Sequence, residues 1–270
     1  MMKSYVRTLA LPTLIAIAAA LPAGAQERQT DRNAFRWAGR VPQGAWVRVQ
    51  NVSGAIRVER ATGDQVEIVG VKTWRRSDPA DVRIEARKYG ANDESVIVCA
   101  FWTENATCDE QGYRSRGDRS GRSNDVSVEF TVRLPAGVRV NVGTVNGEVM
   151  VDGATSEVRA GTVNGGVEAY SSGGPVTAST VNGNVRVRMG RLTGEQDLRY
   201  ATVNGNVIVE FTGDVDADIE LTTVNGRLQS DFPLALQGRI DPRHLRATIG
   251  KGGRNIRLTT VNGNVELRKR

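Results

Sequence analysis

The chain has 270 residues and contains 36 Lys and Arg, 30 Asp and Glu, one His and two Cys. One His and two Cys cannot supply a four-ligand structural zinc site or hold an iron–sulfur cluster, so both classes are excluded. The formal net charge of +6 falls to near zero once a basic leader and one arginine-rich stretch are set aside, which argues against nucleic-acid binding.

Residues 1–25 have the pattern of a signal peptide. Two basic residues precede an apolar stretch over residues 9–21, and small residues lead up to Ala25, as in cleavable leaders. The alternative, an N-terminal membrane anchor, needs ~20 apolar residues, more than this stretch has. We predict cleavage between Ala25 and Gln26. The mature protein is then exported to the periplasm, the cell surface or the exterior, with no transmembrane segment.

Residues 26–137 are predicted to form an irregular β region. They hold nine aromatic residues, including all four Trp, and several short segments in which apolar and polar residues alternate. Within them, Trp46 to Val58 looks like a degenerate first copy of the repeat described below, with Asn51-Val-Ser-Gly54 in place of its central motif. We expect this region to cap one end of the repeat array, where a bare sheet edge would promote aggregation.

Cys99 and Cys108 lie in a strand-like segment and in the polar stretch that follows it. Eight residues separate them, a spacing that lets two cysteines face each other across a hairpin. A catalytic redox pair usually has closer cysteines and a helix N-terminus that lowers one thiol pKa, and neither feature is visible. We therefore predict a structural disulfide, which agrees with export.

Residues 111–124 form a stretch rich in Arg, Ser and Gly, for which we predict a solvated loop. Its four arginines are Arg114, Arg116, Arg119 and Arg122. Because these cations lie close together in the sequence, the loop is a candidate contact for an anionic surface such as acidic lipid or polysaccharide.

Residues 138–270, which continue directly from the preceding region, are dominated by one repeat. The tetrapeptide Thr-Val-Asn-Gly starts at Thr144, Thr162, Thr180, Thr202, Thr223 and Thr260. The spacings are 18, 18, 22, 21 and 37 residues, and the last is close to two repeats with a degenerate copy between. Positions two and four before each Thr, and five and seven after it, are almost all hydrophobic. This period-2 alternation predicts two half-buried strands per repeat.

The phase of the alternation changes at the motif, so the chain must bend there if both strands face one core. Asn-Gly can close tight antiparallel hairpins, or it can form the corner of a β-solenoid coil. Near-identical repeats favour the solenoid, an all-β, parallel β-helix-like fold with coils of 18–22 residues, because stacking places like residues on like. The Asn amides can then hydrogen-bond in a ladder.

We expect Asn and Gly to tolerate a left-handed backbone at these corners. The predicted corner residues are Asn146, Gly147, Asn164, Gly165, Asn182, Gly183, Asn204, Gly205, Asn225, Gly226, Asn262 and Gly263. Beyond them, the basic residues 268–270 are expected to protect the far end of the array by their charge.

The sequence resembles a bacterial adhesin-like family of β-strand-repeat domains, related to head domains named for a Gly-Ile-Asn motif. The likeness rests on Asn51-Val-Ser-Gly54, on the lead-in from Leu134 to Val140 and on the iterated Val-Asn-Gly coils, and it covers about residues 35–270. It implies the solenoid fold. It implies no catalytic residues, because the family has no catalytic motif and is largely of unknown function.

The sequence shows no arrangement of residues suited to catalysis, so we predict no enzyme activity, no metal site and no cofactor. The outward residue directly after each corner varies between acidic, basic and neutral types, and so does the residue at the third position before each Thr. Neither is the acidic row that a polysaccharide-cleaving β-helix needs. His244 has no nucleophile motif beside it.

We expect a non-catalytic binding protein at the surface or in the periplasm, whose partner is an envelope glycan or an envelope protein. The alternative is a structural or envelope-stress accessory protein without a ligand of its own. A polysaccharide-active enzyme ranks behind both.

Overall fold

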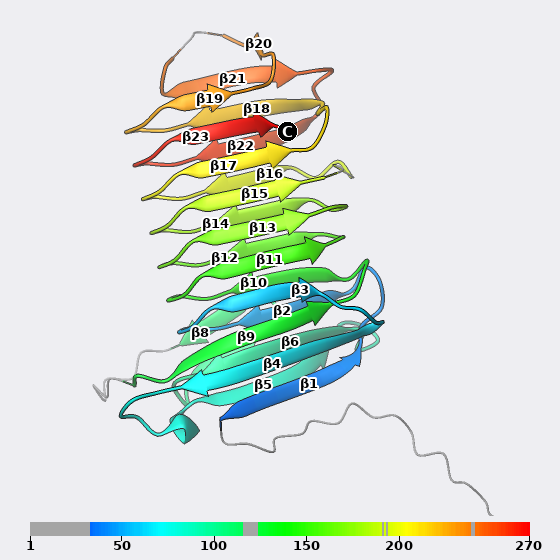
Figure 1. Ribbon diagram of the computed structural model, residues 1–270, viewed down its shortest axis with the longest axis vertical. Coiled ribbons are helices and arrows are strands. Elements are labelled where there is room, and N and C mark those ends of the chain that lie inside the picture. Colours follow the sequence, from blue (N-terminus) through cyan, green and yellow to red (C-terminus); the bar gives the residue numbers. More distant parts are fainter. Residues whose placement is uncertain (1–32, 116–123, 191, 193, 239–240) are drawn as a thin grey trace, which may run out of the picture.

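A computed structural model describes residues 33–115, 124–190, 192, 194–238 and 241–270 of the chain. Within these residues two large sheets face each other, and each coil of the repeat contributes one strand to either sheet (Figure 1). The strands that follow successive motifs pair in parallel, so the predicted β-solenoid is confirmed and the hairpin alternative is wrong. The predicted cleavage site at Ala25 and Gln26 lies outside the described residues.

The two sheets are named here by the strands they contain. Sheet A has the order β1 (Ala34–Arg40), β4 (Gln65–Thr73), β9 (Ser127–Leu134), β3 (Ile56–Arg60), β11 (Val149–Ala154), β13 (Val167–Ser171), β15 (Val185–Met189), β17 (Val207–Phe211), β23 (Val265–Lys269) and β19 (Leu228–Ser230). Sheet B has the order β20 (Ala235–Leu236), β21 (His244–Ile249), β18 (Ala217–Thr222), β22 (Arg254–Thr259), β16 (Leu198–Ala201), β14 (Val176–Ser179), β12 (Val158–Gly161), β10 (Arg139–Gly143), β2 (Trp46–Gln50), β6 (Ser95–Phe101) and β5 (Arg83–Tyr89).

Like residues stack on like along the solenoid. Val149, Val167, Val185 and Val207 occupy one inward column of sheet A, and each pairs with the next in register. The inward columns of both sheets are buried and form one continuous hydrophobic core between them. The outward residues alternate with these and face solvent, as the period-2 pattern predicted.

The corner motifs form two ladders of side-chain hydrogen bonds. The corner Asn residues follow the spatial order Asn146, Asn164, Asn182, Asn204, Asn262, Asn225, and each one after the first donates its amide to the Asn before it at 2.8 Å. The buried Thr of each motif donates its hydroxyl to a neighbouring glycine carbonyl, for example Thr162 Oγ1 to Gly147 O at 2.9 Å. The predicted Asn ladder is therefore confirmed.

Glycine is needed at the corners because the coils approach closely there. Gly165 has a φ of +150°, and a Cβ on it would lie 2.6 Å from the carbonyl carbon of Gly147. Five of the six corner glycines have φ between +150° and +159°, whereas none of the six corner Asn has a positive φ. The expectation of a left-handed Asn is wrong, because the bend takes place at the glycine.

At the C-terminal end the coils do not stack in chain order. β22 lies between β16 and β18, and β23 lies between β17 and β19 (Figure 1). The last 37-residue interval therefore holds no degenerate coil. Between β19 and β22 it holds β20 and β21, and β21 pairs antiparallel with β18 to close the end. The expectation that residues 268–270 protect this end is also wrong, because β23 runs inside the stack.

The N-terminal end is interlocked in the same way. β2 and β3 form the predicted degenerate coil, with Ser53 bridged to Asn146. This coil lies between β10 and β11 on one side and β6 and β9 on the other. Antiparallel strands then end the stack, β4 and β1 in sheet A and β5 in sheet B. A short 3-10 helix, η1 (Pro79–Asp81), connects β4 to β5.

The predicted disulfide between Cys99 and Cys108 is confirmed, but it does not cross a hairpin between them. Cys99 lies in β6, whose neighbours are β2 and β5, while Cys108 lies in β7 (Ala106–Asp109), which pairs with β8 (Gly112–Ser115). The bond holds the β7–β8 hairpin against the outer face of β6, where Ile97 and Phe101 are buried beneath it.

Candidate functional site

The outer face of sheet B is cationic over six adjacent strands. Five arginines and no carboxylate occupy the outward positions of six adjacent strands, β2, β10, β12, β14, β16 and β22. The arginines are Arg48, Arg139, Arg159, Arg199 and Arg257. Sheet A carries charges of both signs at the corresponding positions of β3, β11, β13, β15, β17 and β23. These are Arg57, Arg186, Arg188 and Arg268 together with Glu59, Asp152, Glu168, Glu210 and Glu266. Because anions are attracted to concentrated positive charge, sheet B presents the candidate binding face.

The interlocked coil order creates this face. In chain order, the position three before each motif ends with Arg199, Glu220 and Arg257. In space Arg257 pairs with Arg199, and Glu220 comes after it. The column in sheet B therefore reads Arg48, Asn141, Arg159, Thr177, Arg199, Arg257 and then Glu220. The column contains basic, neutral and acidic residues, as expected, but in space its one carboxylate comes after the first six strands.

An aromatic residue holds the arginines in place at the N-terminal end of the row. The guanidinium carbons of Arg139 and Arg159 lie 4.8 and 4.7 Å from the centre of the Trp46 ring, within cation–π range. Arg48 donates from Nε to the Tyr89 hydroxyl at 2.6 Å. Burial raises the pKa of Tyr89, so its phenol stays neutral and accepts this hydrogen bond.

A shallow groove runs beside the middle of the row. The last outward positions of β10, β12 and β14 are the small residues Gly143, Gly161 and Ser179, and they line a depression of about 540 Å³. Arg159 and Arg199 line the same depression. A ligand lying along the groove would therefore contact backbone and cations together.

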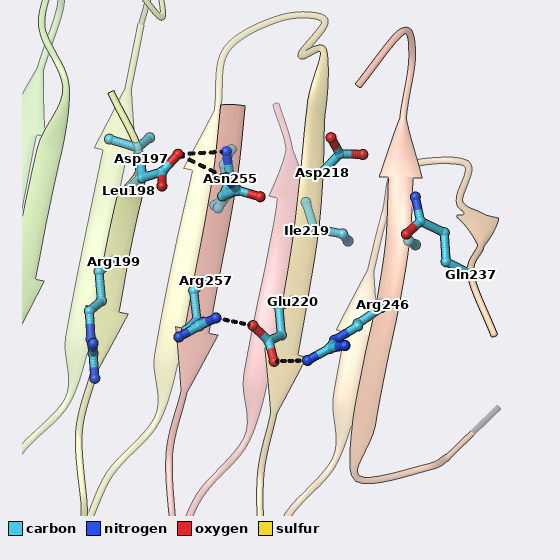
Figure 2. Close-up of a pocket in the computed structure, with 12 residues that line it drawn as sticks. Asp197, Leu198, Arg199, Asp218, Ile219, Glu220, Gln237, Arg246, Asn255 and Arg257 are labelled. Carbon is cyan, nitrogen blue, oxygen red and sulfur yellow. Dashed lines mark hydrogen bonds and ion pairs between the residues drawn. The ribbon is translucent and has the colours of Figure 1, made fainter. Parts of the chain in front are cut away.

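At the other end of the row the carboxylates are engaged by the protein itself (Figure 2). Glu220 accepts from Arg257 at 2.6 Å and from Arg246 at 3.2 Å. Burial works to raise the Glu220 pKa, but the two arginines outweigh it and leave that pKa below its usual value. Asp197 accepts from the backbone and side-chain amides of Asn255 at 3.0 and 3.1 Å.

Arg199 is the available cation of this end. It is exposed and makes no ion pair with any described residue, and Figure 2 shows it apart from the Glu220 cluster. The depression drawn there has a volume of about 520 Å³ and an open rim. Asp218, on its upper side, has a lowered pKa because it accepts from Thr248 and from the Gly253 amide. Its carboxylate is therefore ionised and already hydrogen-bonded.

His244, the histidine of this chain, has structural partners. His244 shares a hydrogen bond with Thr222 at 3.0 Å, and its Nε2 lies 3.7 Å from Glu220. Within the described part of the chain no three His, Cys, Asp or Glu side chains lie together as a metal site would need. The arrangement on sheet B is suited to holding anions by charge and hydrogen bonds.

The predicted arginine loop is placed only in part. Arg114 lies in strand β8, so residues 112–115 are not loop, and its guanidinium pairs with Asp109. Arg116, Arg119 and Arg122 lie outside the described residues. The sequence pointed to this loop because its charges are contiguous. It predicted no residue of the arginine row as a contact, because the charges of that row lie on separate strands and come together only in space.

The twelve predicted corner residues line one edge of the solenoid, beside the groove. They carry no charge, and their amides and carbonyls are largely used by the ladders. Among the described residues of sheet B, the charged side chains of the outer face come from the arginine row and not from the corners.

Residues 41–268 match the family model described as Toastrack DUF4097. The chain belongs to the Toastrack family. This membership confirms the resemblance to a β-strand-repeat family of unknown function. A solved putative cell adhesion protein of Clostridium sporogenes matches with 11% identity and a TM-score of 0.40, over 88% of this chain and 100% of its own. A putative adhesin of Bacteroides fragilis matches with 10% identity and a TM-score of 0.33, over 89% of this chain and 98% of its own.

No curated protein matches the sequence of this Toastrack member. Among its described residues, none of the helical segments is long and apolar enough to cross a membrane.

Proposed function

We propose that this Toastrack protein is an exported, non-catalytic binding protein that holds a linear acidic polysaccharide of the cell envelope along the outer face of sheet B. The observation that carries the proposal is the contrast between the two outer faces. One has five arginines and no carboxylate in the outward positions of six adjacent strands, and the other is mixed. Guanidinium groups bind carboxylates and sulfates with charge-assisted hydrogen bonds.

The shape of the cationic surface favours a polymer over a membrane. The central cations form a row one side chain wide, which crosses the strands from β2 to β22 and lies beside a groove floored by small residues. A membrane would need charge spread over a broad area. A chain molecule, by contrast, gains contacts one after another along such a row, each weak and together additive.

Export and the absence of turnover are part of the proposal. The disulfide supports an oxidising compartment, and the leader pattern supports secretion. The acids nearest to the arginine row, Glu157 and Glu220, are tied in ion pairs with Arg159, Arg246 and Arg257. They are therefore poorly placed to exchange protons with a substrate.

The test compares two single arginines on opposite faces. Arg199→Gln removes an exposed cation of sheet B that makes no ion pair with a described residue. Arg186→Gln removes an exposed arginine of sheet A that also lacks an ion pair to described residues. Binding of the mature chain to acidic polysaccharides is measured by biolayer interferometry at low and physiological salt. We expect Arg199→Gln to weaken binding about threefold, Arg186→Gln to leave it unchanged, and salt to weaken it throughout.

Three results would contradict the proposal. Equal losses in both variants would show that no particular face binds. Equal binding to neutral and acidic polysaccharides would remove the role of charge. Tighter binding to phosphatidylglycerol vesicles than to any polysaccharide would make the ligand a membrane surface.

A further inference from the structure

We infer that the polysaccharide held by sheet B carries a free amino sugar next to an acidic sugar, and that the depression drawn in Figure 2 binds the ammonium group of this amino sugar. This inference rests on the proposed function and adds the chemistry of one part of the ligand. It follows from the carboxylates that line this depression and from the arginine that it shares with the groove.

The groove and the depression of Figure 2 meet at Arg199, which lines both. The groove lies over β10, β12 and β14, and the depression lies over β16, β22 and β18. In sheet B these six strands are neighbours in that order. A polymer that leaves the groove across the strands therefore reaches Arg199 and then the depression.

One side of the depression is acidic, as Figure 2 shows. Asp218 of β18 is in register with Asn255 of β22, and Asp197, just before β16, accepts from the Asn255 backbone amide on the other side. Arg199 follows Asp197 by two residues, so their Cα atoms are about 7 Å apart along the strand. The depression thus has a carboxylate side and an arginine side.

The protein neutralises the arginine side more fully than the carboxylate side. Glu220 pairs there with Arg257 and Arg246. On the carboxylate side, neither Asp197 nor Asp218 forms an ion pair with a described residue.

The two carboxylates differ in what they can still accept. Asp218 uses both oxygens, one for the Thr248 hydroxyl and one for the Gly253 amide. Asp197 uses only Oδ1, which accepts from both nitrogens of Asn255. Its Oδ2 accepts no hydrogen bond from the described part of the chain and lies on the exposed side of the molecule's surface. Asp197 is therefore the available acceptor of the depression.

An ammonium group fits this environment better than an acidic or a neutral group does. It donates up to three hydrogen bonds, and a charge-assisted bond to a carboxylate is stronger than one from a neutral amide. A carboxylate of the ligand would be repelled by Asp197 and Asp218. Arg199, two residues from Asp197, is available for the carboxylate of the adjoining sugar.

The experiment compares two forms of one polysaccharide with the full mature chain. Heparosan alternates glucuronate with N-acetylglucosamine, and its N-deacetylated form has the same carboxylates together with free ammonium groups. Both are used at one chain length in biolayer interferometry, at low salt and at mildly acidic pH, where the amine is protonated. Net charge alone favours heparosan on a cationic face. We expect the N-deacetylated form to bind about threefold more tightly instead.

A single variant assigns this preference to the depression. Asp197→Asn removes the charge and keeps an oxygen that accepts from Asn255, so it should weaken binding of the N-deacetylated form about threefold and leave heparosan binding nearly unchanged. Glu168→Gln is the matched control and should change neither affinity, because Glu168 is exposed on sheet A without an ion pair to a described residue. Thermal melting checks the fold, and Asp218→Asn should have an effect in the same direction if Asp197→Asn proves unstable.

The outcomes separate this inference from the proposed function. If heparosan binds at least as tightly as its N-deacetylated form, or if Asp197→Asn and Glu168→Gln affect binding equally, the depression binds no ammonium and the inference is wrong. It is equally wrong if the chain binds other acidic polysaccharides but neither form of heparosan. In these cases the proposed function stands as long as Arg199→Gln still weakens binding. If no acidic polysaccharide binds, the proposed function itself fails.

Discussion

Replacing Gly165 with alanine tests whether close contact between coils at the corner holds the solenoid together. A Cβ at this position would overlap the Gly147 carbonyl of the neighbouring coil, with its carbon only 2.6 Å away. The overlapped atom belongs to the backbone, so it cannot turn aside as a side chain can. The two coils must separate locally instead.

The cost has two parts. An L-residue at a φ of +150° adds strain of about 1–3 kcal/mol, and overpacking of a well-packed site costs about 1–3 kcal/mol. Moving the Gly147 carbonyl also weakens the hydrogen bond it accepts from Thr162 Oγ1. We expect Gly165→Ala to reduce the free energy of unfolding by about 2–5 kcal/mol, which lowers the melting temperature by on the order of 10 °C.

The next residue supplies the control. A Cβ on Gly166 would meet only the Asn184 carbonyl, at 3.5 Å, an ordinary contact, so Gly166→Ala should change stability by no more than about 0.5 kcal/mol. Urea denaturation followed by circular dichroism gives both values. If the two variants unfold at the same urea concentration, close approach at the corner does not govern stability, and the account of the motif is wrong.

Three further predictions concern the disulfide, the coil order and Glu220. The Cys99→Ala/Cys108→Ala double variant should lose about 2.5–3 kcal/mol in urea denaturation, because the bond closes a short loop in the unfolded chain; an unchanged midpoint would contradict this. Deleting residues 252–270 should leave β18 without its parallel neighbour β22 and β19 without β23 and abolish the single cooperative transition. A monomer on size-exclusion chromatography with native melting would refute the inserted coil. The pKa of Glu220 is lowered by Arg246 and Arg257, so its ionised form stabilises the fold above the unfolded value of 4.5 and this contribution is lost as pH falls through the lower native pKa. The stability difference between wild type and Glu220→Gln should therefore shrink between about pH 5 and pH 3 in thermal melts, and a constant difference would contradict it.

Local patterns in the sequence carry real information about this fold. The alternation on either side of each Thr-Val-Asn-Gly motif predicts two strands per coil, because burial of one sheet face demands period 2. Repetition of the motif predicts parallel stacking and the Asn ladder, because identical side chains at one level can pair only if coils stack in register. The disulfide follows from two cysteines in one short segment of a chain whose leader pattern predicts export.

The partners of each coil could not be predicted in this way. Coils of similar sequence present similar edges for strand pairing. Either the coil at Thr223 or the coil at Thr260 could therefore stack on the coil at Thr202. Pairing of distant strands depends on how the whole stack closes. The structure resolves this with β22 and β23 inserted ahead of β18 and β19, and with the coil of β2 and β3 inserted at the opposite end.

The candidate site shows the same division. By itself the sequence determined the coil, the corner, the disulfide and the outward position of each arginine, since all of these depend on neighbours within one repeat. Only the tertiary structure decided that Arg48 and Arg257 extend one row with Arg159 and Arg199, and that Glu220 ends it. A charged row across strands is a property of the order in which coils stack, and that order is set by contacts between residues far apart in the chain.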